Sequence, residues 1–167
     1  MSPLSRGNDA KSREALSCTQ IAATKLVMAT MSRTPQKVFL AEDDDDMRSL
    51  IRVALERDGC EVVEARDGAE LIDMLGMTVE CPSAQPDVVI TDVRMPNFSG
   101  LGVLRTLRQA HWTVPVILIT VDPGAAVQSD AAQWGAAAVF KKPFDIEDLR
   151  TAVVNARRLR ARDETSP

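Results

Sequence analysis

The sequence has little cysteine and almost no histidine. Its three cysteines, Cys18, Cys60 and Cys81, form no CxxC spacing. This argues against a disulfide framework and a structural zinc site, and it favours a reducing cytoplasm. His111 is the single histidine, so most catalytic triads and histidine-rich metal sites are excluded.

The chain also lacks an excess of positive charge and a long hydrophobic run. Its formal net charge of -4 gives no general attraction to nucleic acid or to anionic membranes. The apolar stretch at residues 21–30 is interrupted by Lys25 and is too short to span a bilayer, so we expect no membrane contact. With 167 residues, 45% of them hydrophobic, the chain suits one well-buried domain rather than two.

The composition divides the chain into three parts. Residues 1–35 are polar and mixed, which predicts a disordered or loosely helical N-terminal tail. We expect a single folded domain over residues 36–162 and a short C-terminal tail over residues 163–167.

From Lys37 the sequence alternates between short apolar runs and helical patterns. Strands are predicted at 38–41, 61–65, 87–91, 114–120 and 137–140. Residues 76–86 are predicted to form a loop, and the first helix carries one apolar face made of Met47, Leu50, Ile51, Ala54 and Leu55. Five such units predict an α/β fold with a doubly wound, flavodoxin-like parallel sheet and five helices. We expect the order 2-1-3-4-5, because the second strand is the most polar and suits an edge.

Polar side chains stand at the ends of four of these strands. Glu42 and Asp43 follow the first strand, Asp92 the third, Thr120 ends the fourth and Lys142 follows the fifth. Because parallel strands point the same way, these side chains are expected to meet at one rim of the sheet. Crowded carboxylates repel one another unless a cation lies among them, and oxygen ligands without histidine or cysteine suit Mg2+.

These groups are the ones that phosphoryl transfer requires. A carboxylate oxygen of Asp92 attacks phosphorus and forms an acyl phosphate, while Mg2+ and a lysine ammonium neutralise the phosphoryl oxygens. Each feature alone has an ordinary explanation: the acidic run as a solvated helix start, Asp92 as a loop cap, and the two lysines before Pro143 as exposed charge. Their placement at four strand ends on one rim favours a site.

Four segments of the chain resemble the receiver domain of bacterial two-component response regulators. These are VFLAEDDDDMR, DVVITDVRMPNFSG, PVILIT and FKKPF, and the resemblance covers residues 37 to about 160. It implies a role for each site residue: Asp92 as phosphoacceptor, Asp43 as direct metal ligand beside Glu42, the carbonyl of Arg94 as a further metal ligand, Thr120 as switch hydroxyl, and Lys142 as phosphate contact.

The resemblance also implies partners. The phosphodonor would be a phosphohistidine on a sensor histidine kinase or a histidine phosphotransfer protein. The phosphorylated domain would signal by docking to a downstream protein target, and a phosphorylation-dependent dimer is left open. Because only RARDETSP follows the last predicted helix, we expect a stand-alone, chemotaxis-regulator-like form without a DNA-binding domain.

Three departures from the family pattern affect the output and the lifetime of the phosphoryl group. Val139 occupies the switch position where the family usually carries an aromatic, with Phe140 beside it, which argues against the usual rotating-aromatic step. The loop before the third strand is longer than usual. Val121 stands where a small residue is usual, and together with an Arg94–Asp122 pair it could obstruct water and make the phosphorylated form long-lived.

Two other function classes remain open. The first is a receiver-shaped interaction module that is never phosphorylated. The second is a phosphohydrolase with Asp92 as nucleophile, which would need a second carboxylate near the nucleophile that Val93 and Arg94 do not supply. In the preferred interpretation the protein is not an enzyme, since it catalyses only its own phosphorylation and slow dephosphorylation.

Overall fold

The computed structural model describes residues 35–163. The predicted tails therefore lie outside the described residues, apart from Pro35 and Asp163. The strands are β1 (Lys37–Ala41), β2 (Glu61–Ala65), β3 (Val88–Asp92), β4 (Val116–Thr120) and β5 (Ala138–Lys141). The helices are α2 (Asp45–Arg57), α3 (Gly68–Met77), the short 3-10 turn η1 (Pro82–Ala84), α4 (Gly100–Gln109), α5 (Ala125–Gln133) and α6 (Ile146–Asp163).

The strands form one parallel sheet in the order β2-β1-β3-β4-β5. This confirms the predicted doubly wound fold with five helices, and it confirms that the polar second strand lies at an edge. In register, Asp92 pairs with Ile119 and Thr120 pairs with Lys141, so neighbouring strands end at nearly the same level. Within residues 35–163 no helix combines the length and the apolar character needed to cross a membrane.

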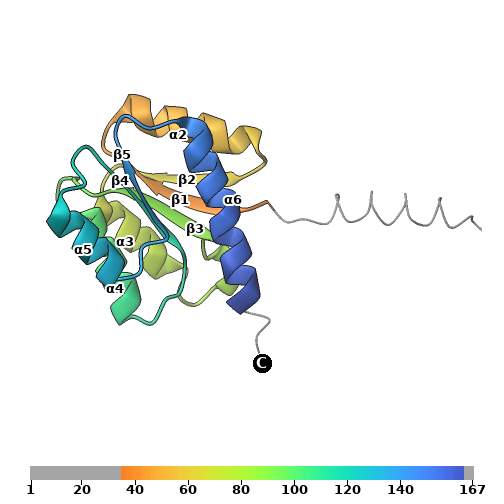
Figure 1. The fold of residues 1–167 in the computed structure, drawn as a ribbon. Coiled ribbons are helices and arrows are strands. Elements are labelled where there is room, and N and C mark those ends of the chain that lie inside the picture. The colour runs from red at the N-terminus through yellow and green to blue at the C-terminus, as the bar shows by residue number, and fades with distance from the viewer. Residues whose placement is uncertain (1–34, 164–167) are drawn as a thin grey trace, which may run out of the picture. The chain divides into compact units, whose positions relative to one another are not determined.

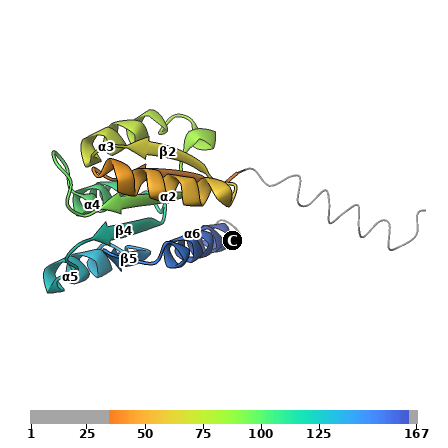
Figure 2. The same ribbon diagram turned by 90° about the horizontal axis from the view of Figure 1, so that it is seen from above.

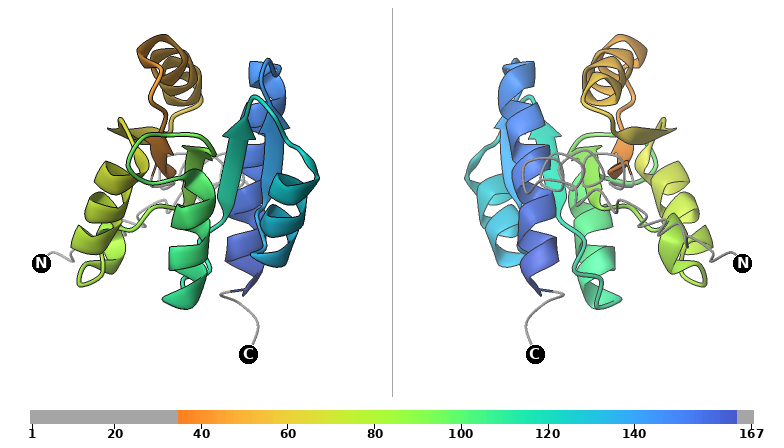
Figure 3. Two further views of the ribbon diagram at one scale, coloured as in Figure 1. Left: turned by 90° about the vertical axis from the view of Figure 1, so that its left-hand side faces the viewer. Right: turned by 90° about the vertical axis from the view of Figure 1, so that its right-hand side faces the viewer.

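Helices cover both faces of the sheet, as Figures 1 and 2 show. Leu40, Ile90 and Ile117 point to the face covered by α2 and α6, where they pack with Leu55 and Leu149. The alternate side chains of the same strands pack beneath α3, α4 and α5, which lie side by side in Figure 3. Burying each large aliphatic side chain contributes about 1.5–3 kcal/mol, so two continuous cores hold the central strands rigidly.

Side-chain caps fix where the helices begin at the carboxyl end of the sheet. Asp44, Asp67 and Ser99 accept hydrogen bonds from the backbone N–H groups of Met47, Glu70 and Gly102, in the first turns of α2, α3 and α4. These bonds satisfy donors that a helix start otherwise leaves unpaired.

The structure corrects several details of the predicted elements. Leu50 was assigned to the apolar face of the first helix, but its side chain is 55% exposed, because it lies on the flank of the stripe that Ile51 and Leu55 bury. Residues 76–86 are not all loop, since α3 runs to Met77 and η1 forms a short turn. β4 begins at Val116 rather than at residue 114, after Pro115, which has no N–H to donate to a strand ladder.

We expect two glycines of α3 to respond oppositely to substitution by alanine. A Cβ on Gly68 would lie 2.1 Å from the carbonyl oxygen of Phe98, whereas a Cβ on Gly76 would meet nothing within 4 Å. Gly68→Ala should therefore lower the free energy of unfolding by about 1–3 kcal/mol. Gly76→Ala should raise it by roughly 0.5 kcal/mol, since glycine is a poor helix former.

Urea denaturation of both variants measures the difference. Equal stability of the two variants would show that α3 can shift away from the loop that carries Phe98 at no cost.

Candidate functional site

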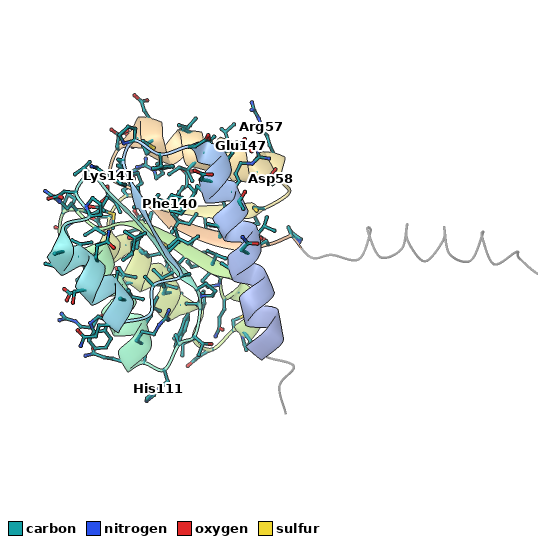
Figure 4. All side chains as sticks on the ribbon, viewed as in Figure 1. Arg57, Asp58, His111, Phe140, Lys141 and Glu147 are labelled. Carbon is teal, nitrogen blue, oxygen red and sulfur yellow. The ribbon has the colours of Figure 1, made fainter. Side chains whose placement is uncertain are left out.

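The strand ends bring the predicted site residues to one rim of the sheet. Glu42, Asp92 and Thr120 are buried there, with 0%, 5% and 0% of their surface exposed. Asp43 is exposed, and Lys142 is half-buried directly after β5. Figure 4 shows Lys141, next to this rim, at the opposite end of the domain from His111, which therefore takes no part in the site.

Three carboxylates of the rim lie close enough to hold one cation. Glu42, Asp43 and Asp92 each offer an oxygen, and these oxygens all lie within 4.8 Å of one another. Three like charges at such distances repel, so a cation among them lowers the energy of the ionised cluster. The ligand set is all oxygen and partly open to solvent, which fits Mg2+, an ion that binds through few carboxylates and keeps several waters.

Lys142 supplies a cation between two of these carboxylates. Its Nζ lies 2.7 Å from both oxygens of Glu42 and 2.5 Å from Oδ2 of Asp92. Its backbone N–H donates to the carbonyl of Thr120 at 2.7 Å, which ties the residue to the end of β4. The ammonium is thus already positioned at the carboxylate that the sequence marks as nucleophile.

Burial and charge act against each other at Glu42 and Lys142. Burial is the largest influence on Glu42 and, together with the Asp92 charge, holds its pKa above the ordinary value, although the hydrogen bond and the charge of Lys142 act to lower it. The pKa of Lys142 is also raised: desolvation alone would lower it, but the hydrogen bonds to Asp92 and Glu42 outweigh that effect. Relative to water, the site therefore favours the charged form of Lys142 and disfavours the ionised form of Glu42.

The loops after β3 and β4 hold the remaining predicted residues. The Arg94 N–H donates to Oδ1 of Asp92 at 2.7 Å. The hydroxyl of Thr120 lies 3.3 Å from both the N and the O of Asp122, so the loop after β4 holds it. The predicted ion pair across the mouth of the site is present, with 3.2 Å between the Arg94 guanidinium and the Asp122 carboxylate, both largely exposed.

Val139 and Phe140 point to opposite faces of β5. Val139 packs against the core beneath α3, α4 and α5. Phe140 packs on the α2 and α6 side, where its ring centroid lies 5.9 Å from that of Phe144. The neighbouring phenylalanine therefore does not replace the aromatic that the resemblance expects at position 139.

Sequence reasoning missed three residues that support the rim. The buried Arg48 donates from Nη1 to the carbonyl of Glu42 at 2.7 Å and also pairs with Asp45 and Glu64. Asn97 donates to Asp67, the cap of α3, at 2.7 Å. The position of Arg48 one turn into the helix after the acidic run could have suggested its contact, but the Asn97 contact depends on loop conformation.

Comparisons with known proteins agree with this geometry. The family model for the response regulator receiver domain matches residues 38–154. The chain is 33% identical over 119 residues to the DNA-binding transcriptional regulator NtrC of Escherichia coli, covering 71% of this chain and 24% of NtrC. It is 33% identical over 113 residues to the transcriptional regulatory protein CpxR of the same species, covering 68% and 45%.

The solved structures include the same fold. The receiver domain of Francisella response regulator 1452 superposes with a TM-score of 0.68 at 25% identity, covering 75% of this chain and 98% of that domain. The chain spans about a quarter of NtrC and less than half of CpxR, so the likeness concerns their receiver portions. Its match to the family model over most of the described residues, together with the acidic rim, places this chain in the receiver-domain family of two-component response regulators.

Proposed function

We propose that this receiver domain accepts a phosphoryl group on Asp92 and passes the signal on by protein docking. The observation that supports this most is the contact of the Asp92 carboxylate with Lys142 beside two further carboxylates, at the end of a central strand. The donor would be a phosphohistidine on a sensor histidine kinase or on a histidine phosphotransfer protein. A cytoplasmic location remains a prediction from the cysteine pattern.

The transfer forms one bond and breaks one. An oxygen of Asp92 attacks phosphorus in line as the bond from phosphorus to the donor histidine breaks, and that electron pair stays on the imidazole nitrogen. Lys142 is placed to move from Asp92 onto the phosphoryl oxygens, because its ammonium is already 2.5 Å from the attacking carboxylate. Positioning and charge neutralisation supply most of the rate enhancement in such reactions.

A divalent ion fits the acidic cluster and would complete the charge balance. Glu42, Asp43 and Asp92 would hold Mg2+, with the carbonyl of Arg94 as a further ligand. When bound, Mg2+ neutralises phosphoryl oxygens that would otherwise repel the carboxylates. Because Lys142 contacts both oxygens of Glu42, its ammonium and a bound ion would compete for this carboxylate.

Output would proceed through the face formed by β4, β5 and their following helices. The Thr120 hydroxyl would turn from the Asp122 backbone toward the acyl phosphate, while Val139 offers no aromatic ring to rotate with it. A coupling of about 1–3 kcal/mol between the two sites is typical of such switches. The DNA-binding activity named for NtrC belongs to that longer protein and is not assigned to this chain.

Acetyl phosphate labelling tests the proposed function. The protein should take up one phosphoryl group in the presence of Mg2+, and the label should be released by hydroxylamine, as expected for an acyl phosphate. EDTA should prevent labelling. Absence of label with acetyl phosphate and with several phosphorylated histidine kinases would favour an interaction module that is never phosphorylated.

We expect the phosphorylated form to be long-lived, because Val121 and the Arg94–Asp122 ion pair lie in the loops that follow β3 and β4 at the mouth of the site. Exposed ion pairs contribute at most about 1 kcal/mol, so Arg94→Ala should speed phosphate loss by no more than about fivefold. Val121→Ala should have the larger effect, because the branched side chain of Val121 stands beside Thr120. Single-turnover dephosphorylation of both variants in Mg2+ measures this.

Asp122→Ala is the matched control for the ion pair. If the pair acts as a unit, Asp122→Ala should match Arg94→Ala, and the double variant should be no faster than either. Unchanged rates in both Val121→Ala and Arg94→Ala would disprove obstruction of the water.

A further inference from the structure

The loop between β3 and α4, residues 93–99, leaves the phosphoacceptor strand and returns to the same place. At its start, the Arg94 N–H donates to Oδ1 of Asp92 at 2.7 Å. At its end, a Cβ on Gly100 would lie 2.2 Å from the carbonyl oxygen of Asp92, so the first residue of α4 rests on the backbone of Asp92. Both ends of the loop are therefore in contact with Asp92.

The middle of the loop is attached to a different element, the start of α3. Nδ2 of Asn97 donates to Oδ2 of Asp67 at 2.7 Å, while Oδ1 of Asp67 accepts from the Glu70 N–H at 2.9 Å. One carboxylate thus caps α3 and holds the loop at the same time. Asn97 has a left-handed backbone with φ of 63°, a conformation that asparagine tolerates better than most residues.

Beside this hydrogen bond, the backbone of the loop also lies close to the backbone at the start of α3. A Cβ on Gly68, directly after Asp67, would lie 2.1 Å from the carbonyl oxygen of Phe98, directly after Asn97. Behind these contacts, α3 is anchored by Leu71 and Leu75, which are buried in the core. The loop therefore rests on a part of the fold that cannot easily move.

We propose that Asp67 and Asn97 are positioning residues for the phosphorylation site, because their hydrogen bond holds the loop whose Arg94 N–H orients the Asp92 carboxylate. This inference rests on the proposed function. Neither residue touches the carboxylate cluster in the structure, so both act through the loop. Residues that orient the groups around a metal site typically change affinity or activity by roughly 10–100-fold when they are replaced.

The chemistry of the two side chains allows the link to be broken and remade. An ionised Asp67 only accepts hydrogen bonds, so Asn97 must present its NH2 group to it. Asn97→Asp places two carboxylates face to face and breaks the link. Asp67→Asn alone keeps it, because the amide of Asn97 can rotate and present its oxygen. Asp67→Asn combined with Asn97→Asp restores it with donor and acceptor exchanged, at unchanged net charge.

The test measures the dissociation constant of Mg2+ by calorimetry and the rate of labelling by acetyl phosphate at saturating Mg2+. Asn97→Gly removes the side chain and tolerates the left-handed backbone, and it should weaken Mg2+ binding or slow labelling by about tenfold. Asn97→Asp should be impaired in labelling, while the exchanged pair and Asp67→Asn should lie within about twofold of the wild type. The thermal midpoint should change little, since Asn97 is exposed and Asp67 is only half-buried. Glu56→Ala, which removes another exposed side-chain hydrogen bond, the one that Glu56 accepts from Arg52 on α2, is the control and should change neither quantity.

Two results would overturn the inference. One is an Asn97→Gly variant equal to the wild type in both Mg2+ binding and labelling. The other is an exchanged pair as impaired as Asn97→Asp alone, which would show that the identity of the residue matters and the link does not. A wild-type protein that takes no label would instead contradict the proposed function, and the Mg2+ measurement would still report on the link.

Discussion

Replacing Asp92 by asparagine is expected to abolish phosphoryl labelling by acetyl phosphate and by phosphorylated kinase. Asp92 lies at the end of β3 with its side chain buried among Glu42, Asp43 and Lys142. An amide of the same size keeps the packing and the hydrogen bond from the Arg94 N–H, but its oxygen is a poor nucleophile and cannot form a stable acyl phosphate. We therefore expect the loss of label to be complete rather than partial.

Two further acidic residues provide controls for this result. Asp46→Asn removes an exposed carboxylate from the first turn of α2, outside the cluster, and should leave labelling unchanged. Asp43→Asn should weaken the dependence on Mg2+ and slow labelling, because it removes a carboxylate of the cluster but keeps the nucleophile. Persistent labelling of Asp92→Asn at the rate of the wild type would place the phosphoacceptor elsewhere.

The gathering of these residues at one rim could be predicted from the sequence because it depends on sheet topology. Apolar runs ending in Glu42, Asp92 and Thr120 predict parallel strands, and the carboxyl ends of parallel strands share one edge. The structure brings Glu42, Asp43 and Asp92 together as expected, and places Lys142 on two of them. Small errors in the strand boundaries did not matter, since each site residue lies at or just after the end of its strand.

Features that depend on loop conformation could not be predicted in this way. The contact between Asn97 and Asp67 requires a left-handed residue in the loop, and no periodic pattern indicates one. Helical spacing placed Leu50 with Ile51, although only one of them is buried, because periodicity does not define how wide the covered stripe is. The contact of the Lys142 ammonium with two carboxylates at once depends on side-chain geometry, which only the folded structure shows.

Replacing Lys142 by methionine is expected to change three measurable properties in different directions. The substitution keeps most of the unbranched side chain and removes the ammonium that contacts Glu42 and Asp92 at 2.7 and 2.5 Å. Labelling should slow by roughly 100-fold, the usual loss when one preorganised donor to a developing charge is removed. Mg2+ should bind more tightly, because the cation that competes for these carboxylates is gone.

The same substitution should destabilise the protein without Mg2+ more than with it. Removing one partner of a buried ion pair costs about 3 kcal/mol, since the remaining charges are left unpaired. Mg2+ binds the folded form of the variant and should recover part of this loss, so that the thermal midpoint of Lys142→Met rises more with Mg2+ than that of the wild type. Labelling rates, calorimetric Mg2+ binding and thermal denaturation together separate these effects.

The pH dependence of the stability of Lys142→Met gives a further check on the role of Lys142. Burial raises the pKa of Glu42, and Lys142 is the main group that opposes this. Without the lysine the folded-state pKa of Glu42 should rise further above its unfolded value, so the deficit in stability relative to the wild type should be smallest at low pH and grow as the pH rises through that folded-state pKa.

Lys141→Met, the exposed neighbour, is the matched control and should change none of these properties. A Lys142→Met variant that labels normally, or that binds Mg2+ more weakly than the wild type, would contradict the role of Lys142 as the cation exchanged for metal and phosphate.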